Sequence, residues 1–120
     1  MGLIYTVTKV TNISSGEKSY TMPFLVDTAA TDTIIPANEL EKLGIKREIK
    51  RNYELLDGTV VSYDVGYAFL CINGEKVAAN VVFGDENSEP LLGVTALESA
   101  GFIVDPIRQT LKKTAAIPLK

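Results

Sequence analysis

The feature that most constrains the fold is the two-residue turn Asn73-Gly74, which separates two strand-like runs at residues 65–72 and 76–83. Asn and Gly both tolerate the positive φ angles that the tightest hairpin turns require. Asn-Gly between such runs is therefore a strong indication of a β-hairpin. A chain with this hairpin at its centre is expected to build its core from antiparallel strands.

Further turns extend the same pattern along the chain. A second hairpin is predicted at Asp57-Gly58, and a third joins strands at residues 3–10 and Ser19–Val26. Strands are also expected at residues 102–104 and around 110–119. The 120 residues contain no internal repeat or linker, so we predict a single domain over residues 1–120. Its expected class is all-β, a closed barrel of hairpins with two short helices.

The two helices are expected close to proline and glycine signals. The first follows Pro36, with Asn38 as its N-cap. The second covers residues 95–100, where Thr95 and Glu98 form a capping box. Each helix is followed by a glycine suited to a left-handed C-terminal turn, namely Gly44 and Gly101.

The chain contains no histidine and one cysteine. Ser-His-Asp and Cys-His catalysis are therefore excluded, as are zinc sites built on imidazole or on several thiolates. Cys71 cannot form an internal disulfide and is expected to be a small core residue. Acid–base chemistry would fall to carboxylates, lysine or tyrosine. No metal site and no cofactor are predicted.

The formal net charge is −3, and the basic residues are scattered apart from a loose cluster at Lys46, Arg47, Lys50 and Arg51. Nucleic-acid binding is not expected, because it relies on clustered contacts to phosphate. No apolar run approaches the roughly 20 residues that cross a bilayer, and the first residues lack signal-peptide order. We therefore expect no membrane association and a cytoplasmic location.

Asp27 directly follows an apolar strand that ends at Val26. Burial of a carboxylate is costly unless it is hydrogen-bonded or shares a proton. Judged alone, an acid at this point more often caps a turn at a strand end than takes part in catalysis. Its residue type and position leave both interpretations open.

The wider order of elements resembles the retropepsin family of aspartic proteases. The segment Asp27-Thr28-Ala29-Ala30 is similar to the family's Asp-Thr/Ser-Gly-Ala motif, and Leu91-Leu92-Gly93 is similar to its hydrophobic-hydrophobic-Gly turn. The resemblance extends from Leu3 to about Leu111. It implies an aspartic endopeptidase that acts on polypeptide. Because the mechanism requires two Asp-Thr loops and the chain has one, the resemblance also implies a twofold homodimer.

The resemblance further implies a role for each matching residue. Asp27 would share a proton with Asp27 of a second subunit and activate a water, and Thr28 would hydrogen-bond across the dimer axis. The Asp57-Gly58 hairpin matches the flap, a mobile hairpin that closes over substrate. The implied catalytic positions are Asp27, Thr28 and Ala29. The implied substrate-binding positions are Ala30, Asp32, Asp57, Gly58, Leu92 and Gly93.

Ala29 stands where the family motif has glycine, which leaves a second interpretation open. The added methyl group favours a catalytically weak or inactive dimer that binds a peptide or protein in its cleft. A third interpretation is a small β-barrel unrelated to proteases, in which Asp27 is a turn residue.

Overall fold

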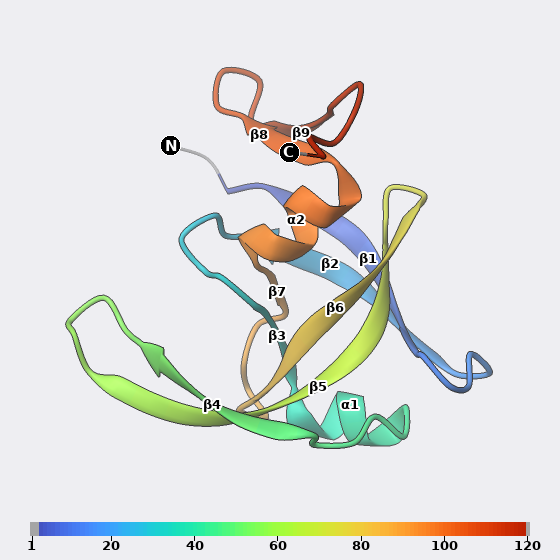
Figure 1. Ribbon diagram of the computed structural model, residues 1–120, viewed down its shortest axis with the longest axis vertical. Helices are drawn as coiled ribbons and strands as arrows, with labels where there is room; N and C mark the ends of the chain where they lie inside the picture. The colour runs from blue at the N-terminus through green and yellow to red at the C-terminus, as the bar shows by residue number, and fades with distance from the viewer. Residues whose placement is uncertain (1–2, 120) are drawn as a thin grey trace.

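The computed structural model describes residues 3–119, which form a mostly β structure with two short helices, as predicted (Figure 1). Within these residues, seven strands form one sheet in the order β1-β2-β7-β3-β6-β5-β4, and β8 pairs with β9 separately. The strands are β1 (Tyr5–Asn12), β2 (Ser19–Val26), β3 (Thr33–Pro36), β4 (Ile49–Glu54), β5 (Val60–Ile72), β6 (Glu75–Gly84), β7 (Leu91–Leu92), β8 (Phe102–Asp105) and β9 (Thr110–Lys113). The helices are α1 (Ala37–Lys42) and α2 (Val94–Ala100).

All three predicted hairpins are present. Antiparallel pairs join β1 to β2, β4 to β5 and β5 to β6. At the central turn, Asn73 has φ 46° and Gly74 has φ 86°, the positive values that a type I′ turn requires. Gly58 also has φ 86°, so glycine meets a backbone requirement at the tip of the β4–β5 hairpin.

Strand β1 pairs on both of its edges. It pairs with β2 along its length, while its end from Thr8 to Asn12 also pairs with β5. The pairings therefore run from β1 through β2, β7, β3, β6 and β5 back to β1. Strand β4 lies outside this ring and, among the described residues, pairs with β5 alone.

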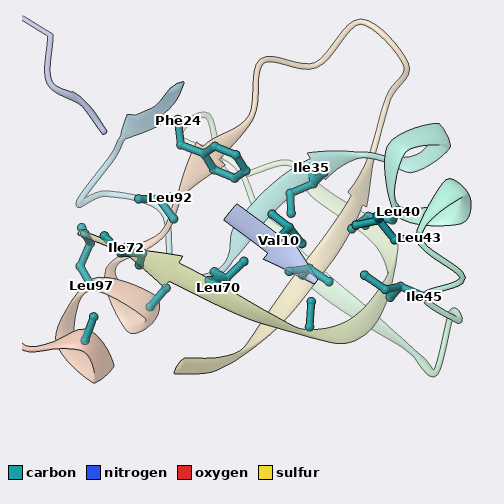
Figure 2. Close-up of a cluster of buried hydrophobic side chains, with 14 of the residues drawn as sticks. Val10, Phe24, Ile35, Leu40, Leu43, Ile45, Leu70, Ile72, Leu92 and Leu97 are labelled. Atoms are coloured by element: carbon teal, nitrogen blue, oxygen red, sulfur yellow. The ribbon is translucent and has the colours of Figure 1, made fainter. Parts of the chain in front are cut away.

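The core fills the space inside this ring of strands (Figure 2). Strand β1 shows how the period-2 pattern fills it, because Thr6, Thr8 and Val10 are buried while the alternate residues face outward. Val10 packs with fully buried side chains from β2, β3, β5 and β7, namely Phe24, Ile35, Leu70 and Leu92. Helices α1 and α2 extend the core with Leu40 and Leu97.

The two helices begin differently from the sequence prediction. Pro36, not Asn38, is the N-cap of α1, because Ala37 already has helical geometry and places Asn38 inside the first turn. Gly93, not Thr95, is the N-cap of α2, and neither cap makes a side-chain hydrogen bond. The predicted ends are confirmed, since Gly44 and Gly101 have φ of 74° and 81°.

Two further expectations need correction. Strand β9 ends at Lys113 instead of continuing to residue 119; Thr114 still donates its N–H and hydroxyl to the carbonyl of Gly101, and the chain then bends at residues 115 and 116. Cys71 is half-buried and lies outside the core, since it alternates along β5 with the buried Leu70 and Ile72. No helix within residues 3–119 is long and apolar enough to span a membrane.

The core assignment predicts very different losses of stability for two leucine-to-alanine substitutions. Leu70 has an exposed fraction of 0%, whereas Leu56 at the tip of the β4–β5 hairpin has one of 102%. Leu70→Ala should lower the free energy of unfolding by about 2–5 kcal/mol, because it opens a cavity in the core. Leu56→Ala should change it by less than about 0.5 kcal/mol. Urea unfolding followed by circular dichroism measures both, and a similar loss in the two variants would contradict the core described above.

Candidate active site

Residues 27–32 form the loop that joins β2 to β3, and Asp27 is its first residue. The N–H of Asp27 donates to the carbonyl of Leu92 at 3.1 Å. One oxygen of its carboxylate, Oδ1, accepts the N–H of Ala29 at 2.9 Å. The N–H of Ala30 donates to the Asp27 carbonyl at 3.2 Å. The half-buried acid thus stabilises its own turn, as an aspartate at a strand end often does.

Only one oxygen of the Asp27 carboxylate takes part in this turn. Within residues 3–119, the second carboxylate oxygen accepts no hydrogen bond. Thr28 and Ala29 are exposed beside it. One oxygen therefore orders the loop, and the other remains open to a group from outside the chain.

The segment from Leu92 to Thr95 supports the loop from below. The N–H of Gly93 donates to the buried hydroxyl of Thr33 at 3.1 Å. The first backbone N–H groups of α2 donate to loop carbonyls, Val94 to Ala30 at 2.8 Å and Thr95 to Thr31 at 3.2 Å. The Thr95 hydroxyl also donates to the Thr31 carbonyl at 2.8 Å. Loop carbonyls therefore take the helix N–H groups that a capping side chain would otherwise accept.

Gly93 permits this contact because it has no side chain. A Cβ atom at this position would lie 2.5 Å from the carbonyl carbon of Asp32 and 2.6 Å from the carbonyl oxygens of Thr31 and Asp32. These are backbone atoms, so they cannot move aside as the end of a flexible side chain can. The structure therefore places Leu92 and Gly93 directly against the Asp27 loop.

Ala29 has a backbone conformation that does not require glycine. The non-glycine residues of the described chain with positive φ are Asn73 and Gln109, and Ala29 is not among them. The exposed Ala29 methyl group is therefore compatible with the loop as it is folded.

Asp32 lies at the far end of the loop, and its side chain has an exposed fraction of only 2%. Its Oδ2 accepts the hydroxyl of Tyr53 at 2.7 Å and lies 3.7 Å from the guanidinium Nη1 of Arg51. Burial and this hydrogen bond raise the pKa of Tyr53 well above its ordinary value. The resemblance implied that Asp32 lines the substrate cleft; in the described chain its side chain is buried and bonded to the half-buried Tyr53.

The family comparison gives this geometry a context. Residues 16–99 match the family described as "gag-polyprotein putative aspartyl protease". The chain belongs to this family. The matched region contains both the Asp27 loop and the Gly93 turn beneath it.

Solved structures of viral proteases share the fold. The simian foamy virus (mac) protease is 22% identical with a TM-score of 0.54, and the match covers 78% of this chain and 90% of that one. EIAV protease, solved with the inhibitor HBY-793, is 14% identical with a TM-score of 0.55, covering 83% and 89% respectively. No curated protein sequence matches the chain significantly. The retropepsin-like resemblance is thus confirmed for family and fold.

The predicted site residues of this aspartyl protease family member fall into two groups. The loop and its support bring together Asp27, Ala30, Asp32, Leu92 and Gly93, with Thr28 and Ala29 at the surface of the loop. Asp57 and Gly58 lie at the exposed tip of the projecting β4–β5 hairpin (Figure 1). Hydrogen bonds from Thr59 lower the pKa of the Asp57 carboxyl. Among the described residues, no hydrogen bond joins this tip to the Asp27 loop.

The sequence analysis missed Tyr53 and Arg51 as partners of the loop. The two residues alternate along β4, so they share one face of the strand. This spacing was visible in the sequence, but the residue they face is 21 positions from Tyr53 and is brought there by the fold.

A methyl group at position 93 should disturb the loop and its support. Gly93→Ala should lower the free energy of unfolding by about 1–3 kcal/mol, because the new Cβ overlaps backbone atoms of Thr31 and Asp32. Gly16→Ala is the matched control, since a Cβ there meets nothing within 4 Å, and it should stay within about 0.5 kcal/mol. Denaturant unfolding of both variants measures the difference. Equal stability would show that the contact at Gly93 is looser than described.

Proposed function

We propose that this chain is an aspartic endopeptidase, in which two Asp27 carboxylates, one from each subunit of a homodimer, activate a water that hydrolyses a peptide bond. The observation that carries the proposal is the geometry of the Asp27 loop. Its carboxylate is fixed through Oδ1 by the Ala29 N–H, while the other oxygen has no hydrogen-bond donor within the described chain. The carboxylate is therefore oriented by the fold and still available for reaction.

Two facing carboxylates would divide the chemistry between them. They cannot easily both ionise at close range, so the pair holds one proton. The ionised member removes a proton from water as the water oxygen attacks the peptide carbonyl carbon. The protonated member donates to the carbonyl oxygen, and a proton then passes to the departing amine as the carbon–nitrogen bond breaks. These steps use carboxylates alone and no cofactor.

The second carboxylate must come from another copy of the chain. The other Asp-Thr pair, Asp32-Thr33, is buried, and both side chains are already engaged, with Tyr53 and with the Gly93 N–H respectively. Asp32 is thus unavailable as the partner of Asp27. Thr28 is exposed next to Asp27, where its hydroxyl can bond to the equivalent loop across a twofold axis.

Exposed apolar side chains near both termini support a dimer as well. The exposed side chains are Leu3 just before β1, Tyr5 and Val7 on β1, and Ile117 and Leu119 after β9. The first and the last segments that the structure describes lie at the same end of the molecule (Figure 1). A second copy that covers these side chains would remove their apolar surface from water.

The ring of strand pairings through β1 and β5 likewise supports the barrel expected of an acid-protease fold.

Three of the predicted substrate-binding positions, Ala30, Asp57 and Gly58, are half-buried or exposed and so accessible to a polypeptide. Ala30 is half-buried in the same loop as Asp27, next to exposed backbone. We assign the β4–β5 hairpin, with Asp57 and Gly58 at its tip, to a flap that closes over the substrate and excludes water.

The proposal predicts that Asp27→Asn abolishes cleavage. Wild type should cleave members of a diverse peptide library between acidic and neutral pH, and Asp27→Asn should be slower by about 10²- to 10⁴-fold, because the amide can neither accept nor share the proton. Asp85→Asn, which changes an exposed loop carboxylate, is the matched control and should cleave as wild type does.

Two outcomes would count against the enzyme. Equal cleavage by wild type and Asp27→Asn would exclude the aspartic mechanism. A folded dimer that cleaves nothing, whether it carries Ala29 or Ala29→Gly, would indicate the peptide-binding alternative.

A separate mixing experiment tests the shared site. Wild type mixed with an equal amount of Asp27→Asn should retain about half of its activity at constant wild-type concentration, because random pairing places half of the wild-type chains in inactive mixed dimers. Native mass spectrometry of isotope-labelled chains would show that the subunits exchange. Undiminished activity in a fully exchanged mixture would mean that each chain carries a complete site.

A further inference from the structure

The outer part of the β4–β5 hairpin is held to the body of the protein by few groups. Strand β4 is an edge strand, and residues 60–64 of β5 pair only with β4 among the described residues. Pairing of β5 with β6 begins at Val65. Figure 1 shows this part of the hairpin projecting beyond the ring of strands. Its position relative to the Asp27 loop is therefore not set by the sheet.

Two side-chain contacts join the hairpin to that loop, and both are to Asp32. The hydroxyl of Tyr53, on β4, donates to Oδ2 of Asp32 at 2.7 Å. Arg51 lies on the same face of β4, but its guanidinium is 3.7 Å away and its side chain has an exposed fraction of 43%. The Tyr53 hydroxyl is the shorter and better shielded of the two contacts. A hydrogen bond to an ionised acceptor is also stronger than one between neutral groups.

Asp32 provides a fixed point for this contact. The backbone of Thr31 and Asp32 lies against Gly93, and the Thr31 carbonyl accepts bonds from the backbone and side chain of Thr95. The same short loop begins with Asp27. Whatever is bonded to Asp32 is therefore placed in a defined relation to the reactive carboxylate.

We propose that Tyr53 is a positioning residue, whose bond to Asp32 sets the hairpin over the Asp27 loop at the spacing that a bound peptide requires. The proposal rests on the proposed protease function, since it is that function which gives the hairpin a substrate to cover. If the hydroxyl is removed, the buried Asp32 carboxylate keeps only its longer contact to Arg51. The hairpin position that this hydrogen bond holds is then less strongly favoured over positions farther from the loop. The hairpin therefore spends less time in the geometry that binds peptide.

Tyr53→Phe isolates the hydroxyl. The ring remains, together with its packing 6.3 Å from the ring of Tyr63. Tyr63→Phe is the matched control, because Tyr63 is a half-buried tyrosine on the adjacent strand whose hydroxyl makes no hydrogen bond within the described residues. Asp32→Asn is the second variant, since it removes the charge but keeps an oxygen that can accept the Tyr53 hydroxyl.

The first measurement is backbone hydrogen exchange, which does not depend on activity. Tyr53→Phe should exchange about tenfold faster than wild type across residues 50–64, because a hydrogen bond to a charged group is lost. Residues 65–84 should be unchanged in the same variant. Tyr63→Phe should match wild type throughout, and Asp32→Asn should fall between wild type and Tyr53→Phe.

The second measurement is the kinetics of peptide cleavage. Tyr53→Phe should raise KM about tenfold and change kcat by less than about threefold, since the hydroxyl positions the hairpin and does not touch the reacting atoms. Tyr20→Phe removes the hydroxyl of a half-buried tyrosine on β2, outside the hairpin, and should leave both constants at the wild-type values.

The outcomes separate this proposal from the proposed function. Unchanged exchange in the hairpin of Tyr53→Phe overturns the proposal, and so does faster exchange spread equally over residues 65–84, which would show a general loss of stability. A rise in hairpin exchange without any rise in KM overturns the role in substrate binding. If wild type cleaves nothing but hairpin exchange rises as expected, the protease function fails while the positioning contact is supported.

Discussion

The site depends on the close approach of two backbone segments at Gly93. The loop that begins with Asp27 passes so near this residue that a single added carbon would lie 2.5 Å from the backbone of Asp32. With that approach, the N–H groups at the start of α2 reach the loop carbonyls, and the Gly93 N–H reaches Thr33. Surface loops are usually more mobile than the elements they connect. Here hydrogen bonds and close contacts hold one side of the loop, and the other side stays open around Asp27.

The contrast between Asp27 and Asp32 follows from this arrangement. Both carboxylates belong to one short loop, but they point into different surroundings. Asp32 is buried and bonded to Tyr53, so its position is set by the packing of the chain. Asp27 is half-buried, and within the described chain its carboxylate accepts a hydrogen bond from the Ala29 N–H alone. Burial requires Asp32 to be hydrogen-bonded, whereas the half-buried Asp27 carboxylate is the one to which the proposed function gives the chemistry.

The sequence predicted those features that depend on local backbone geometry. Asn73-Gly74, Gly44 and Gly101 were identified because positive φ is a property of a few residue types, whatever lies around them. The N-cap at Thr95 was predicted wrongly because carbonyls of the Asp27 loop accept the first N–H groups of α2, and the N-cap at Asn38 because α1 already begins at Ala37. The bond between Tyr53 and Asp32 has no local signature, since it depends on how the edge strand folds back over the loop.

Ala29 stands where the family motif has glycine, and the structure shows which requirement for glycine the chain itself lacks. A glycine can be required by backbone conformation or by the close approach of other atoms. The first requirement is absent here, because Ala29 does not have positive φ. Since Ala29 is exposed within its own chain, the second can act only through atoms outside it. The fold of the chain therefore tolerates the methyl group, and under the proposed function its effect falls on the contact with a substrate or a second subunit.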